Sequence, residues 1–60
     1  MESKENLILA EYAALLTEQL DEIEAFNQRG AKAQGRRIRT RNGLIVTKGK
    51  ELRKAMLEAL

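Results

Sequence analysis

The chain has 60 residues, contains no Cys, His, Pro or Trp, and carries a formal net charge of +2. A chain of this length forms one small domain, and without Cys or His it cannot use disulfides or thiolate and imidazole metal ligands. Ser3 has no histidine to activate it, so we expect no catalytic residues. Carboxylates alone could form a site for Mg²⁺ or Ca²⁺, but the chain has no calcium-loop spacing, so we expect no metal site and no cofactor. Because so small a core is only marginally stable, we expect support from self-association.

The charges are divided unevenly along the chain. Residues 1–28 hold seven of the nine acids, whereas residues 29–60 hold ten of the eleven Lys and Arg residues. Such a division favours a binding protein over an enzyme, and the basic half is where a polyanion would bind.

Residues 3–29 are predicted to form a first helix, since Ser3 suits its N-cap and Gly30 suits the left-handed residue that ends a helix. Apolar side chains recur between them with helical spacing, in two adjacent stripes. The principal stripe contains Leu9, Ala13, Leu16, Leu20, Ile23 and Asn27, and the second stripe contains Ile8, Tyr12, Leu15, Gln19 and Phe26. So broad an apolar face indicates more than one packing neighbour.

Residues 32–59 are predicted to form a second helix with one uncharged row at a 3.5-residue period. This row contains Gly35, Ile38, Asn42, Ile45, Gly49, Leu52, Met56 and Ala59. The pattern is typical of a buried seam, in which Asn42 would fix the register. The alternative is a β-hairpin over residues 38–47, because Asn42-Gly43 is a favoured two-residue turn. We favour the helix because polar and apolar residues alternate poorly in those two strands.

Together the two helices predict one all-α domain over residues 1–60, folded as an antiparallel helical hairpin, with an α-β-β-α fold as the alternative. Because one hairpin cannot cover both stripes of the first helix, we expect a homodimer that forms a four-helix bundle. The residues expected at an interface with a second copy or another protein are Leu9, Tyr12, Leu16, Leu20, Ile23, Phe26, Ile38, Ile45, Leu52 and Met56.

The densest basic segment, residues 32–41, contains one Lys and four Arg residues, and it has two interpretations. In the first, the acidic helix neutralises it, within the hairpin or across a dimer. In the second, it binds the phosphates of a nucleic acid, to which arginine is well suited. Sequence readout is not expected, because no groove-reading motif is present and no aromatic residue is interleaved with the basic ones.

Residues 30–54 contain two short basic blocks with a recognisable arrangement. The first has Gly30, Lys32, Ala33, Gly35, Arg37 and Arg39, and the second reads Lys50-Glu51-Leu52-Arg53-Lys54. This segment resembles the histone-like nucleoid proteins of chlamydiae and other bacteria, although Ala31 and Gln34 depart from the pattern of that family. The resemblance implies a DNA-associated helical hairpin, and it adds Arg53 and Lys54 to the basic positions of interest.

We therefore expect a non-enzymatic protein that binds DNA or RNA phosphates with low sequence specificity. The expected contacts are Lys32, Arg36, Arg37, Arg39, Arg41, Arg53 and Lys54. The alternative is a small protein–protein adaptor or inhibitor, including a viral one, which docks through the wide apolar face. No membrane partner is expected, because the stretch Leu7–Leu16 is too short to cross a bilayer. The N-terminus also lacks a secretory signal, so a cytoplasmic location is expected, at the nucleoid or in a host cell.

Overall fold

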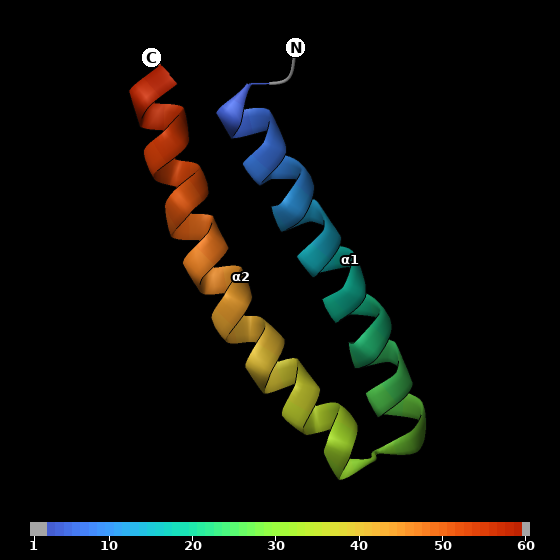
Figure 1. Ribbon diagram of the computed structural model, residues 1–60. Coiled ribbons are helices and arrows are strands. Elements are labelled where there is room, and N and C mark those ends of the chain that lie inside the picture. Colours follow the sequence, from blue (N-terminus) through green and yellow to red (C-terminus); the bar gives the residue numbers. More distant parts are fainter. Residues whose placement is uncertain (1–2, 60) are drawn as a thin grey trace.

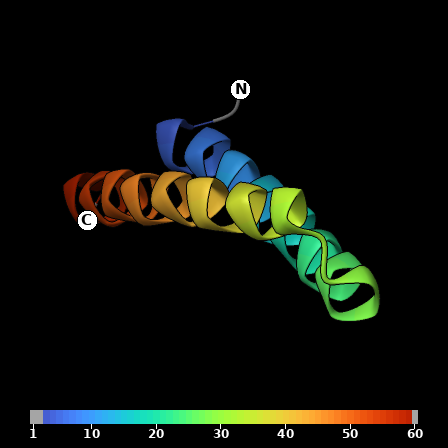
Figure 2. The same ribbon diagram turned by 90° about the horizontal axis from the view of Figure 1, so that it is seen from below.

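The computed structural model describes residues 3–59 and consists of two helices that lie side by side in opposite directions (Figure 1). Helix α1 spans Lys4–Arg29 and helix α2 spans Lys32–Ala59. Figure 2 shows that the two helices cross at an oblique angle and form a single layer. The Cα atoms extend over 44 × 19 × 12 Å. The predicted all-α antiparallel hairpin is therefore confirmed. Residues 1, 2 and 60 of the predicted domain lie outside the described residues.

Both predicted ends of α1 are confirmed. The Oγ of Ser3 accepts a hydrogen bond of 3.3 Å from the backbone N–H of Asn6, so Ser3 is the N-cap. Gly30 has φ 65° and ψ 23°, and its N–H donates to the carbonyl of Phe26 at 2.6 Å. This left-handed conformation is easy for glycine and strained for other residues. It reverses the chain within two residues, Gly30 and Ala31, before α2 begins.

The alternative β-hairpin over residues 38–47 is wrong, because α2 runs as a continuous helix through all of them. An isolated hairpin is marginally stable in water, whereas a helix there can place Ile38 and Ile45 against α1. Gly35, Gly43 and Gly49 each weaken such a helix by about 1 kcal/mol relative to alanine. Tertiary packing offsets that cost.

The seam between the helices uses the second stripe of α1. Its more enclosed residues are Ile8, Tyr12, Leu15 and Gln19 on α1, and Gln34, Ile38, Ile45, Leu52 and Ala55 on α2. Two glycines of α2 make room for aromatic rings of α1. A Cβ at Gly35 would lie 3.3 Å from Cε2 of Phe26, and one at Gly49 would lie 3.4 Å from Cε1 of Tyr12. At both glycines a side-chain ring of α1 therefore approaches the backbone of α2.

The predicted seam of α2 is only partly correct. Gly35, Ile38, Ile45, Gly49 and Leu52 do face α1, but Asn42, Met56 and Ala59 are exposed, so the assignment of these three to the seam was wrong. Instead, Arg41 and Ala55 are the more enclosed residues, one position before Asn42 and Met56, and Lys48 is half-buried beside Gly49. The reason is a roll of α2 about its axis that lets Arg41 and Lys48 reach acids of α1.

The principal stripe of α1 is not covered by the hairpin. Four large side chains in it, Leu9, Leu16, Leu20 and Ile23, remain exposed. The buried hydrophobic side chains of residues 3–59 are only Ile8 and Ala55. As expected from the sequence, one hairpin covers one stripe and leaves the other in solvent.

Candidate nucleic-acid interface

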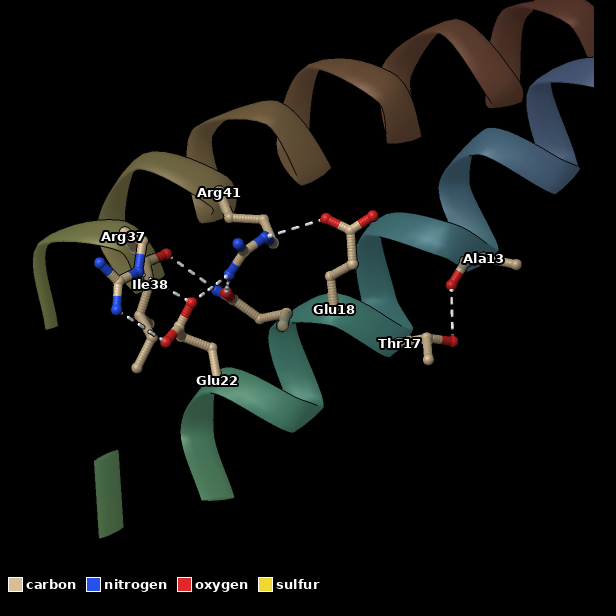
Figure 3. Close-up of polar contacts among 8 residues, drawn as sticks. Ala13, Thr17, Glu18, Glu22, Arg37, Ile38 and Arg41 are labelled. Atoms are coloured by element: carbon tan, nitrogen blue, oxygen red, sulfur yellow. Dashed lines mark hydrogen bonds and ion pairs between the residues drawn. The ribbon is translucent and has the colours of Figure 1, made fainter. Parts of the chain in front are cut away.

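One edge of the seam is lined by ion pairs between the acidic and the basic helix (Figure 3). Arg37 donates two hydrogen bonds to Glu22, from Nε to Oε1 at 3.1 Å and from Nη2 to Oε2 at 3.4 Å. The Glu22 side chain is only 14% exposed, although that of Arg37 is 55% exposed. This bidentate geometry is the strong form of an arginine–carboxylate contact.

Arg41 lies deeper at the same edge, with its side chain only 17% exposed. Its Nη1 donates to Oε1 of Gln19 at 3.2 Å and lies 3.5 Å from Oε1 of Glu22, while its Nε lies 3.6 Å from Oε2 of Glu18. The hydrogen bond from Arg37 has the largest effect on the pKa of Glu22 and lowers it. Burial is the second-largest effect and raises the pKa, whereas the charges of both arginines and the hydrogen bond from Arg41 lower it further. Glu22 is thus held ionised between two guanidinium groups.

Lys48 extends the same edge toward the open end of the hairpin. Its Nζ lies 2.9 Å from Oε2 of Glu11 and 3.0 Å from Oε2 of Glu51. The hydrogen bond to Glu11 is the main cause that raises the pKa of Lys48 above its ordinary value of 10.5. Three cations of α2 are therefore bound to acids of α1.

The structure separates the seven predicted phosphate contacts into two groups. Arg37 and Arg41 are engaged by α1, as the internal-neutralisation interpretation predicted for the basic helix. The other five are exposed and, within residues 3–59, take part in no ion pair. Lys50 joins these five. We call the resulting surface the outer face of α2, and it comprises Lys32, Arg36, Arg39, Lys50, Arg53 and Lys54.

The outer face is a stripe along one side of the helix. At 100° per residue, its six cations fall within about 100° of arc, on the side turned away from α1. From Lys32 to Lys54 the stripe runs for about 33 Å, at 1.5 Å per residue. The interval between Arg39 and Lys50 contains no charge on this arc, so the cations form two clusters.

Each cluster of the outer face borders a shallow depression. The first, of about 440 Å³, is lined by Phe26, Gly30, Lys32, Gly35, Arg36 and Arg39. The second, of about 530 Å³, is lined by Lys50, Arg53, Lys54, Leu57 and Glu58. In both depressions several cations surround a partly apolar floor. Such a surface suits a negatively charged ligand.

Two residues that line these depressions, Lys50 and Phe26, were not among the expected phosphate contacts, although Phe26 was expected at an interface with a second copy or another protein. The signal for Lys50 was its spacing of three and four residues from Arg53 and Lys54, which places the three on one helical face. Phe26 belongs to α1, and the tight turn at Gly30 brings it to the same depression as Lys32, Arg36 and Arg39. No aromatic residue is interleaved with the basic ones in the sequence, so only the folded hairpin reveals this neighbour.

Comparison of the chain with models of protein families, with curated protein sequences and with solved structures finds no match in any of the three. The resemblance to the histone-like nucleoid proteins therefore stays a prediction from the sequence. Across residues 3–59, neither helix combines the length and the hydropathy that a membrane crossing requires. The same residues contain no group of three or more acids that could hold a metal ion.

Proposed function

We propose that this protein binds the phosphate backbone of a nucleic acid through the outer face of α2. The observation that supports the proposal is the division of the cations into two sets. The acids of α1 engage Arg37, Arg41 and Lys48, whereas the six cations of the outer face have no acidic partner among residues 3–59. Neutralisation within the hairpin therefore accounts for one set and leaves the other for an external polyanion.

The arrangement of the outer face is unfavourable in the absence of such a ligand. Lys32 and Arg36 are four residues apart, as are Lys50 and Lys54, and each like-charged pair destabilises a helix by about 0.2–0.5 kcal/mol. Binding of phosphates removes this repulsion and releases counterions from the nucleic acid. The 33 Å stripe is comparable to one turn of a DNA duplex, about 34 Å, so its two clusters can contact well-separated phosphates.

Contacts of this kind position a protein on a nucleic acid and carry no sequence information directly. Six phosphate contacts give a slope of log affinity against log salt of about −5 for duplex DNA. Raising the salt from about 50 to about 200 mM then weakens binding by about three decades. The proposed function is thus a salt-sensitive, weakly sequence-specific association.

The test is fluorescence anisotropy with a labelled 20-base-pair duplex over a series of salt concentrations. The informative variant is Arg36→Gln/Arg53→Gln, which removes one cation from each cluster. The matched control is Lys4→Gln/Arg29→Gln, which removes two exposed cations of α1 and so changes the net charge equally. Circular dichroism confirms that all three proteins are helical under the assay conditions.

We expect the slope for the Arg36→Gln/Arg53→Gln variant to become shallower by about 2, one unit for each lost contact. The control variant is expected to keep the wild-type slope. The proposal is wrong if the wild-type protein does not bind at about 50 mM salt, or if both variants lose the same number of salt-dependent contacts.

A further inference from the structure

A row of apolar side chains on α1 lies at the edge of the seam opposite the ion pairs. It comprises Leu9, Ala13, Leu16, Leu20 and Ile23, which we call the leucine face. At 100° per residue, the centre of the leucine face lies about a quarter turn around α1 from the residues that form the seam. Glu11, Glu18 and Glu22 lie on the opposite side of those seam residues. Leu20 is the most exposed of the large residues in the row, at 58%. The leucine face is uncharged over about 21 Å of helix.

The area that the hairpin exposes indicates that a further layer covers it. The chain has an accessible surface of 4819 Å². A compact monomer of 6.8 kDa has about 4,000 Å², so this hairpin exposes roughly 800 Å² more than expected. A standard interface buries about 800 Å² on each partner. Within residues 3–59 no side chain is less than 2% exposed, so the hairpin has no fully buried core of its own.

We propose that the occupant of the leucine face is the leucine face of a second copy of this chain, with the two α1 helices packed antiparallel. The residue spacing supports self-pairing, because positions 9, 13, 16, 20 and 23 are nearly symmetric about position 16. Leu16 then meets Leu16 of the second copy at a two-fold axis. Leu9 meets Ile23 of the second copy, and the small Ala13 meets the large Leu20. Interfaces with two-fold symmetry require this kind of self-complementary surface.

The charges of α1 permit this pairing although the helix is acidic. Glu11, Glu18 and Glu22 lie away from the leucine face, at the edge of the seam that carries the ion pairs. There Lys48, Arg41 and Arg37 neutralise them. On the side of the leucine face away from the seam, the flanking residues are Ala10, Thr17 and Glu24. The antiparallel register places Glu24 near Ala10 of the second copy, so like charges do not meet there. This proposal is independent of nucleic-acid binding.

The absence of cysteine from the chain allows a direct test of the register. We expect Leu16→Cys to form a disulfide-linked dimer under mild oxidation, because the two substituted positions face each other across the axis. Leu20→Cys alone is not expected to cross-link, since its two copies lie about 12 Å apart along the helices, and disulfides require Cα atoms within about 7 Å. A mixture of Ala13→Cys and Leu20→Cys proteins is expected to form the mixed disulfide.

Analytical ultracentrifugation gives an independent measurement on the unmodified chain. We expect a dimer at tens of micromolar, and a monomer for Leu20→Glu at the same concentration because it places two charges in an apolar interface. The matched control is Leu44→Glu, which changes a side chain of similar exposure outside the leucine face and is expected to stay dimeric. Circular dichroism shows whether each variant remains helical.

A wild-type chain that sediments as a monomer would overturn the proposal, and so would a dimer that Leu20→Glu leaves intact. If Leu20→Cys cross-links with itself while Leu16→Cys does not, the antiparallel register centred on Leu16 is wrong. The cross-linking needs no disruptive substitution, so it decides the question even if Leu20→Glu fails to fold.

Discussion

The side-chain amide of Gln19 on α1 donates a 2.9 Å hydrogen bond to the backbone carbonyl of Ile38 on α2. The oxygen of the same amide accepts a 3.2 Å hydrogen bond from Nη1 of Arg41. This buried glutamine is thus satisfied by two groups of the opposite helix. Because both groups belong to α2, the contact selects one alignment of the two helices, which is the role that the sequence had suggested for Asn42.

The seam contains a second buried glutamine with a different environment. Gln34 is 8% exposed, and its Oε1 has no hydrogen-bond partner among residues 3–59. Replacing each glutamine by methionine, which has a similar shape, should therefore have opposite effects. Gln19→Met is expected to lower the free energy of unfolding by about 1 kcal/mol, and Gln34→Met to raise it by about 1 kcal/mol. Urea denaturation of the two variants measures both changes. If the free energy of unfolding changed in the same direction in both variants, the two glutamines would not differ in hydrogen bonding as described.

Gly43 lies in the middle of α2 with nothing within 4 Å of the Cβ that a substitution would add. Gly43→Ala is therefore expected to stabilise the protein by about 1 kcal/mol, through helix propensity alone. Gly30→Ala is the matched comparison, because no atom lies within 4 Å there either but φ is +65°. An alanine in that left-handed conformation is expected to cost about 1 kcal/mol or more. Thermal unfolding of the two variants, monitored by circular dichroism, measures both effects. If Gly43→Ala destabilised the protein, α2 would not be helical at that position.

The pH dependence of stability should depend on Glu22. Its folded pKa lies below the ordinary value of 4.5 because Arg37 and Arg41 favour the ionised form. The unfolded chain therefore binds this proton more readily than the folded one, and the stabilisation is complete above about pH 4.5 and is lost as the pH falls through the lower folded value. We expect the midpoint of urea unfolding to fall between pH 7 and pH 3 in the wild type.

Glu22→Gln is expected to reduce this loss, because the substituted residue no longer titrates. The matched control is Glu24→Gln, which removes an exposed carboxylate that forms no ion pair with the other described residues. An equal effect of the two substitutions on the pH 7 to pH 3 difference would show that the Glu22 cluster does not control the acid sensitivity.

The sequence predicted the fold well because the relevant signals are local. Ser3, Gly30 and the helical spacing of the apolar residues each act within a few positions, so the helices and the turn follow directly. The rotation of α2 does not follow, since it depends on Arg41 and Lys48 reaching acids about 20 to 40 residues away in the chain. For the same reason the sequence grouped Arg37 and Arg41 with the outer cations.

The contribution of Arg37 and Arg41 to nucleic-acid binding can be distinguished from that of the outer face by removing the acids that engage these two arginines. Glu18→Gln/Glu22→Gln releases Arg37 and Arg41, while Asp21→Asn/Glu24→Gln changes the net charge equally and leaves those ion pairs in place. If nucleic acid is confined to the outer face, both double variants are expected to bind a duplex a few-fold more tightly than the wild type, through net charge alone. The salt slope should then be the same in all three proteins, because the released arginines lie on another side of α2. A slope steeper by about 2 for Glu18→Gln/Glu22→Gln only would show that Arg37 and Arg41 can also contact phosphates, and that α1 restricts binding by occupying them.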